Sequence, residues 1–231
     1  MFYNHKSIKM KKLLLSLFLL FSITAIAQNI RVYNQYVDTE DVAAYAKTFK
    51  DFNEKFIRKS GAIGLQRVQF LNEVTHRVIV TGDPSNWGVE NPADQVDRDN
   101  YFNTVSHYRS KSDGSYTAKS LYWKAGDRVK NNTGQQWLIK VDNPAKYLAA
   151  FTKFAKAVES MIGTRMMGLG AINMGDVDGA THYTVFYGEN LNDLDVILEK
   201  VRATKAYKEF SATRGDQEII KSFMVQDLLR F

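Results

Sequence analysis

The sequence of 231 residues contains no cysteine, which excludes several kinds of site. Without thiolates there is no disulfide, no zinc–thiolate centre, no iron–sulfur cluster and no cysteine nucleophile. The same absence excludes a lipid-modified N-terminal cysteine. Only three prolines are present and 45% of the residues are hydrophobic. This composition is typical of a globular protein whose core is held by packing alone.

The chain also lacks an apolar run long enough for a comfortable membrane span, which needs about 20 residues. Its longest run, from Leu13 to Ile23, follows a basic KMKK segment and precedes an AIA triplet. These features predict a secretory signal peptide over residues 1–27, cleaved before Gln28. They therefore predict a periplasmic or secreted protein with no membrane span in the mature chain. An uncleaved N-terminal anchor is the alternative.

Strong charge of either sign is missing from the expected mature chain. The whole sequence has 31 basic and 25 acidic residues, a net charge of +6. Residues 1–27 hold four lysines and no acid, which leaves 27 bases against 25 acids and a net charge of +2. Proteins that bind nucleic acid carry a strong basic footprint. We therefore expect no nucleic-acid partner.

An internal repeat is visible in three ordered matches. Two residue sets, offset by 102, share the 4-3-4 spacing of one helix face: Tyr45, Phe49, Phe52 and Phe56, and Tyr147, Phe151, Phe154 and Val158. The segment THRVIVTG at 75–82 then matches THYTVFYG at 181–188. Finally, the triplet KSL at 119–121 matches KSF at 221–223. The sequence predicts a duplicated unit.

Each unit is predicted to have the order βαββαβ. The strands are expected at 30–37, 65–71, 76–81, 115–123, 137–141, 169–174, 182–187 and 218–226, and the helices at 39–59, 94–109, 144–161 and 194–210. The first repeat spans 28–124, a polar linker 125–134, and the second repeat 135–231. This order is the ferredoxin-like unit, whose sheet carries helices on one face only. We predict an α+β fold in which two tandem repeats close into a pseudo-symmetric α+β barrel.

The element order, the repeat and the Tyr/Phe pattern resemble the dimeric α+β barrel superfamily. Within it, the chain resembles a tandem single-chain antibiotic-biosynthesis-monooxygenase-like domain pair, and the resemblance covers Ile30 to Phe231. It implies a cavity between sheet and helices, or between the two sheets, that takes a flat organic ligand or haem. Members include cofactor-free monooxygenases and isomerases, haem enzymes and proteins without known activity. Because fold alone does not choose among these, the cofactor stays unknown.

His76 and His182 are the candidate catalytic residues, because they hold matching positions in the two repeats. Histidine is the common general base and metal ligand. Each one begins a strand beside a turn, where an ordinary structural histidine is the alternative. No spacing typical of a metal site accompanies them, so no metal is predicted. His107 is a weaker haem-ligand candidate, since its counterpart in the second repeat is Glu209.

Aromatic residues near strand ends are the candidate ligand-binding residues: Trp87, Tyr122 and Trp123. Loops on a rigid scaffold carry binding groups, and aromatic walls suit flat ligands. For Trp87 the alternative is a plug that folds back over the edge of the domain. Three arginines could line a pocket for an anionic ligand: Arg67, Arg77 and Arg165.

The sequence leaves two functional classes open. The first is an exported α+β barrel protein that binds a small organic molecule, with monooxygenase-like activity as its enzymatic form. The second is a non-enzymatic interaction or structural protein of the bacterial cell envelope, which presents loops such as 82–93 to a partner. An open, polar-studded cavity would favour the first class, and a barrel filled by side chains would favour the second.

Overall fold

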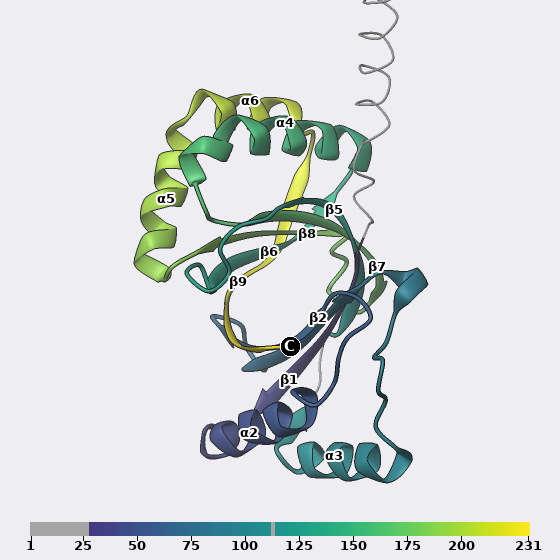
Figure 1. Ribbon diagram of the computed structural model, residues 1–231. Coiled ribbons are helices and arrows are strands. Elements are labelled where there is room, and N and C mark those ends of the chain that lie inside the picture. The colour runs from purple at the N-terminus through teal and green to yellow at the C-terminus, as the bar shows by residue number, and fades with distance from the viewer. Residues whose placement is uncertain (1–27, 112–113) are drawn as a thin grey trace, which may run out of the picture.

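A closed antiparallel barrel forms the centre of the computed structural model, which describes residues 28–111 and 114–231 (Figure 1). The predicted signal peptide lies outside these residues. Neighbouring strands follow the order β3-β2-β9-β6-β8-β7-β5-β1, and β1 also pairs with β3, so that the sheet closes. The strands are β1 Asn29–Val37, β2 Ala62–Gln69, β3 His76–Gly82, β5 Tyr116–Lys124, β6 Thr133–Val141, β7 Met167–Gly175, β8 His182–Gly188 and β9 Gln217–Arg230.

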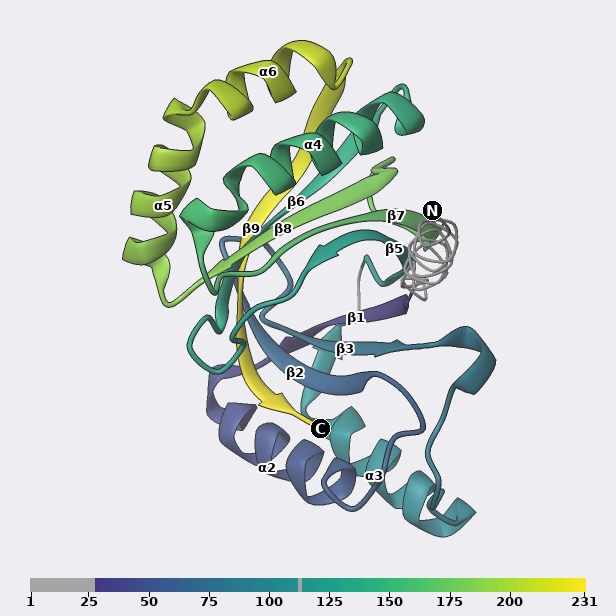
Figure 2. The same ribbon diagram turned by 45° about the horizontal axis from the view of Figure 1, so that its top comes forward.

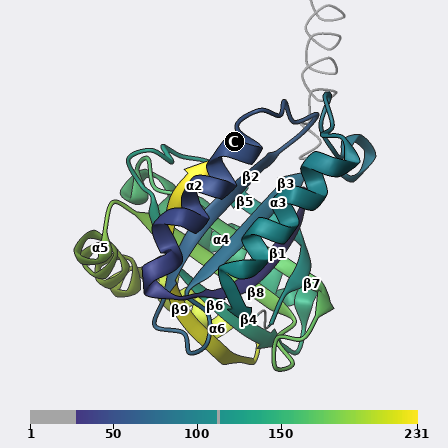
Figure 3. The same cartoon turned by 90° about the horizontal axis from the view of Figure 1, so that it is seen from below.

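Helices cover the barrel on two opposite sides, as the views in Figures 1 and 2 show. One side carries α4 (Pro144–Ile162), α5 (Leu191–Ala203) and α6 (Lys205–Thr213). The other side carries α2 (Val42–Asn53) and α3 (Gln95–His107), which lie in front of the strands in Figure 3. None of the helices in the described ranges is long and apolar enough to cross a membrane.

Side chains alternate between the interior of the barrel and the helix layers, because successive residues of a strand point to opposite faces. Tyr183 and Tyr187 of β8 belong to the buried cluster inside the barrel, whereas Phe186 packs against α4. The predicted helix face lies on α4 and is buried against the sheet: Tyr147, Phe151, Phe154 and Val158. In residues 28–124, Tyr45 and Phe49 of α2 are buried. Phe52, the next residue of the predicted set, stacks on Tyr101 of α3.

Several predicted boundaries differ from the structure. The first helix is shorter than 39–59: a 3-10 turn over Thr39–Asp41 leads into α2, which ends at Asn53. A short strand that was not predicted, β4 (Arg109–Lys111), follows α3 and pairs with β1. The predicted linker 125–134 is two residues shorter, because Thr133 and Gly134 already pair with β8 and β9.

The prediction of one helix over 194–210 is wrong, because the segment contains two helices that meet at Thr204. The backbone of Thr204 is extended, with φ −70° and ψ 154°. Its hydroxyl accepts a hydrogen bond from the Tyr207 amide at 3.1 Å, which is the geometry of a helix N-cap. Apolar spacing continues across the break, so periodicity alone does not reveal it.

Replacing Thr204 by alanine is expected to lower the free energy of unfolding by about 1 kcal/mol, because α6 loses its cap. Serine at the same position keeps a hydroxyl acceptor and should stay close to the wild-type value. Urea unfolding of the two variants measures the difference. Equal stability of Thr204→Ala and Thr204→Ser would show that the hydroxyl does not stabilise the break.

Candidate functional site

A cavity of about 640 Å³ lies inside the barrel, and we call it the barrel cavity. Its volume falls within the range of roughly 300–1,000 Å³ that is usual for small-molecule sites. The inward residues of β3 and β8, which lie four strands apart on opposite sides of the ring, form much of its wall. From β3 these are Arg77, Ile79 and Thr81, and from β8 they are Tyr183, Val185 and Tyr187.

Four cationic side chains line the barrel cavity, and the described lining contains no Asp or Glu: Arg77, Lys119, Arg128 and Arg230. They come from separate elements, namely β3, β5, the segment before β6, and the end of β9. Arg77 is buried, with 2% of its surface exposed, whereas Lys119 and Arg230 are exposed. The cavity therefore has a positive wall that runs from its interior to its rim.

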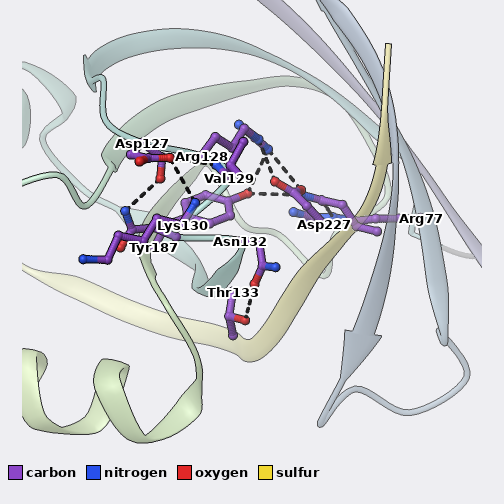
Figure 4. Close-up of polar contacts among 11 residues, drawn as sticks. Arg77, Asp127, Arg128, Val129, Lys130, Asn132, Thr133, Tyr187 and Asp227 are labelled. Carbon is purple, nitrogen blue, oxygen red and sulfur yellow. Dashed lines mark hydrogen bonds and ion pairs between the residues drawn. The ribbon is translucent and has the colours of Figure 1, made fainter.

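The carboxylate of Asp227 lies beside the cavity, and it is already bound. Asp227 on β9 accepts hydrogen bonds from Arg128 Nε at 2.6 Å and from Arg128 Nη2 at 3.1 Å. It also accepts one from Gln66 Nε2 at 2.5 Å. Figure 4 shows Arg128 reaching Asp227 and Tyr187 from the loop between β5 and β6. This bidentate ion pair connects the segment between the two halves to both β9 and β8.

Gln66 on β2 connects this ion pair to the buried Arg77. Its amide nitrogen donates to Asp227 and, at 3.1 Å, to the hydroxyl of Tyr187. Its amide oxygen accepts a hydrogen bond from Arg77 Nε at 2.6 Å. No described carboxylate forms an ion pair with Arg77, and its Nη1 atom lacks a hydrogen-bond partner in this part of the chain.

Tyrosines supply the remaining polar groups of the wall. Tyr116 Oη accepts a hydrogen bond from Gln136 Nε2 at 2.8 Å. Burial raises the pKa of Tyr116 and of Tyr183 above the ordinary value of 10. Both hydroxyls therefore stay protonated at neutral pH and can donate hydrogen bonds. The site combines aromatic rings, neutral donors and cations.

Glycines in the neighbouring strands make room for three aromatic residues of the cavity. In each case the glycine is the direct cross-strand partner of the ring: Gly134 with Tyr187, Gly168 with Trp123, and Gly170 with Tyr183. A Cβ atom at these glycines would lie 2.9, 2.5 and 2.2 Å from the respective ring. The rings lie against bare backbone, and the guanidinium of Arg128 stands 5.2 Å from the ring centre of Tyr187.

The predicted catalytic histidines lie on the other face of the sheet. Residues next to His76 and His182 in the strand, Arg77 and Tyr183, line the barrel cavity, whereas neither histidine does. Each is buried, and each Nδ1 contacts the hydroxyl of the preceding threonine, at 3.0 Å for His76 and 2.9 Å for His182. His76 also packs edge-on to Tyr45 of α2, with 6.2 Å between ring centres. The structure gives each histidine the surroundings of a core residue.

The protein is expected to lose stability through His76 as the pH falls from about 6.5 to 4. Burial, and after it the charge of Arg67, lowers the pKa of His76 from 6.5 to about 4. In that range the unfolded chain binds a proton that the folded chain does not bind. The free energy of unfolding therefore decreases as the pH is lowered, by at most about 1.4 kcal/mol per pH unit for one histidine.

Urea unfolding at several pH values measures this slope. His76→Gln should flatten it, and His107→Gln, at an exposed position near the end of α3, is the matched control. His182 contributes in the same direction, because burial also lowers its pKa. A slope that stays the same in His76→Gln would contradict the expectation.

Two of the three predicted ligand-binding residues lie at the barrel cavity. Trp123 lines it and meets Tyr187 edge-on with 6.4 Å between ring centres. Tyr122 borders the cavity, but its ring packs edge-on against Phe151 of α4, with 5.7 Å between ring centres. Trp87 lies elsewhere: it packs on the buried cluster under α2, and the guanidinium of Arg31 stands 4.4 Å above its ring. Its surroundings match the alternative of a plug at the domain edge.

Of the three arginines proposed for an anionic pocket, only Arg77 lines the barrel cavity. Arg67 is exposed, and its strand neighbours Gln66 and Val68 are the residues that face the interior. Arg165 is bound to Asp193, which accepts from its Nε at 2.9 Å. Alternation along the 76–81 strand would have separated Arg77 from His76. No pattern in the polar 125–134 segment indicates Arg128, and none indicates Arg230.

A second cavity of about 160 Å³ lies between the sheet and helices α4 to α6. Haem iron is held by His, Cys, Met or Tyr. The described lining includes no histidine, and its residues of the ligand types are Met167, Tyr147 and Tyr207. Burial raises the pKa of Tyr147 to about 12, which opposes a phenolate ligand. His107 lies on the opposite side of the barrel, on α3. These residues and this volume do not fit a haem. The described residues also hold no group of three or more metal-binding side chains.

Comparisons with known proteins identify the fold. No family model matches the chain, and no curated protein matches it. Among solved structures, a "putative monooxygenase" from Lactobacillus acidophilus NCFM is similar with a TM-score of 0.56 and 13% identity, covering 88% of this chain and 94% of that one. An anthrone oxidase-like protein has a TM-score of 0.54 and 6% identity, with coverage of 90% and 94%.

A third structure, chlorite dismutase from Candidatus Nitrospira defluvii in complex with imidazole, has a TM-score of 0.53 and 11% identity, covering 87% of this chain and 91% of that one. Identities this low concern the fold and not the activity. The described chain has a ferredoxin-like α+β barrel fold that is similar to the folds of these three proteins.

Proposed function

We propose that this chain is an exported protein that binds a small organic molecule in the barrel cavity. The observation that carries the proposal is the cavity itself, which has about 640 Å³ of space, an aromatic wall and a cationic wall. Of the two functional classes left open by the sequence, an interaction or structural protein would be expected to fill its barrel with side chains. The open cavity supports ligand binding instead.

Export rests on the signal-peptide features of residues 1–27, and it places the ligand in the periplasm or outside the cell. A tandem duplication is also part of the proposal. It is supported by equal strand orders in the two halves, β5-β1-β3-β2 and β9-β6-β8-β7. It is further supported by the Thr–His pairs at 75–76 and 181–182, whose hydroxyls contact the following imidazole in the same way.

An oxygenase that acts on the bound molecule is the enzymatic form of this proposal. The likeness to proteins described as monooxygenase and anthrone oxidase-like supports it. The two histidines give it no support, because they lie on the far face of the sheet. Oxygen consumption by the purified protein in the presence of its co-purified molecule would separate an oxygenase from a binding protein.

The test of the binding function is native mass spectrometry of the protein isolated from its own cells. We expect a co-purifying organic molecule, and we expect Ile79→Trp to lose it, because an indole at this inward position of β3 would occupy the cavity. Thr117→Trp, on the outward face of β5, is the control and should retain the molecule. Retention by Ile79→Trp, or absence of any molecule from the wild type, would contradict the proposal.

A further inference from the structure

The most unusual charge in the protein is the guanidinium of Arg77, because it is buried without a counter-charge. Only 2% of the residue is exposed, and no described carboxylate forms an ion pair with it. Its contacts are neutral: the amide oxygen of Gln66 at 2.6 Å, the hydroxyl of Tyr116, and the ring of Phe223, whose centre lies 5.7 Å from Cζ. A buried charge is costly unless it is paired. The missing partner is an anion.

We infer that the ligand of the barrel cavity is an organic anion and that Arg77 recognises its negative group. This inference rests on the proposed function, since it names the chemical class of the molecule bound there. The Nη1 atom of Arg77 has no hydrogen-bond partner in the described chain. A carboxylate would supply both the acceptor and the charge that this guanidinium lacks.

The other charged groups of the cavity favour the same class of ligand. Lys119, Arg128 and Arg230 also line it, and no acid is part of the described lining. The nearby carboxylate of Asp227 is bound by Arg128 and by Gln66, so it does not neutralise Arg77. A field of one sign attracts the opposite charge and holds it more strongly where water is scarce.

The opposite wall indicates the shape of the ligand's body. Across the barrel from Arg77, β8 presents the rings of Tyr183 and Tyr187, and Trp123 stands beside them. Each ring has a glycine as its cross-strand partner and can lie flat against the sheet. Aromatic walls of this kind suit a planar ring system. A planar aromatic carboxylate therefore matches both sides of the cavity.

The experiment compares carboxylates with amides of the same shape: benzoate with benzamide, 2-naphthoate with 2-naphthamide, and anthracene-2-carboxylate with its amide. Calorimetric titration measures the affinity of each compound for the full chain. We expect the best carboxylate to bind about tenfold or more tightly than its amide, which is the usual scale for a hydrogen bond to a charged group. Inorganic phosphate, a bare anion, should bind more weakly than that carboxylate.

Arg77→Met should abolish this preference, lowering carboxylate affinity about tenfold or more while leaving amide affinity nearly unchanged. The ligand-free variant should melt at a higher temperature than the wild type, because an unpaired buried charge has been removed. Arg67→Met, on the outward face of the neighbouring strand, is the matched control and should keep the preference. If Arg77→Met does not fold, Arg77→Lys provides a charged replacement, which should retain the preference for carboxylates at reduced affinity.

The outcomes separate this inference from the function on which it rests. Equal affinity of carboxylate and amide for the wild type would overturn the inference that the ligand is an anion and leave ligand binding intact. A preference that survives in Arg77→Met would overturn the role of Arg77. If phosphate binds as well as the best carboxylate, the inference that the ligand has an aromatic body is overturned. Failure of all three pairs to bind, together with no co-purifying molecule, would remove the proposed function itself.

Discussion

Replacing Gly170 by alanine is expected to lower the free energy of unfolding by about 3 kcal/mol, at the upper end of the usual cost of overpacking a core. Gly170 of β7 lies directly across from Tyr183 of β8. An added Cβ would stand 2.2 Å from Tyr183 Cε1 and 2.6 Å from its hydroxyl, far inside van der Waals contact. Tyr183 is only 5% exposed, so the ring has little room to retreat.

A double-mutant cycle identifies the ring as the cause. Tyr183→Leu removes the atoms that the new methyl group would strike, so Gly170→Ala should cost much less in that background. We expect a coupling energy of about 1–3 kcal/mol from urea unfolding of the four proteins. If the changes in the free energy of unfolding are additive, Gly170 is needed for the backbone conformation of β7 and not for the packing of Tyr183.

The glycine–aromatic pairs show which part of the site the sequence could not reveal. The β-branched and aromatic content predicted the strand over 182–187, and the structure places β8 at His182–Gly188. Alternation does not indicate which strand lies alongside, and the pairing of Gly170 with Tyr183 depends on the register of β7 and β8. The placement of these rings against bare backbone follows from that register.

The helices were predictable to the extent that their side chains face one core. The buried face of α4 consists of the residues that the spacing predicted: Tyr147, Phe151, Phe154 and Val158. The break at Thr204 was missed, because both α5 and α6 contribute apolar residues to the same cluster. A cap that interrupts a helix is a local hydrogen bond, and hydrophobic spacing does not record it.

The candidate site was only partly predictable for a further physical reason. Tyr122, Trp123 and Arg77 were candidates from the sequence, and all three lie at the barrel cavity. The matching positions of His76 and His182 drew attention to the face of the sheet opposite the barrel cavity. Their strand neighbours differ between the halves, Arg77 in one and Tyr183 in the other. Under the proposed duplication, the residues that serve the fold are preserved in both halves, whereas a binding site in a shared cavity can divide its chemistry between them.

Substituting asparagine for Asp227 is expected to cost about 3 kcal/mol of folding free energy, because Arg128 loses its counter-charge in a largely buried pair. The side chains of Arg128 and Asp227 are 22% and 14% exposed. The change keeps the shape of the side chain and removes the carboxylate that pairs with Arg128 beside the barrel cavity. Urea unfolding at low salt measures the loss.

The Asp227→Asn variant should gain more stability from added anions than a variant that loses an ion pair away from the barrel cavity. Asp193→Asn is the matched control, since Asp193 pairs with Arg165 at similar exposure, 20% and 21%, outside the cavity lining. Both variants lose an ion pair. Only Asp227→Asn leaves an additional unbalanced charge beside Arg77, so sodium phosphate should restore more of its stability than an equal ionic strength of sodium chloride. Equal recovery of the two variants in phosphate would mean that the cations of the barrel do not act together on an anion.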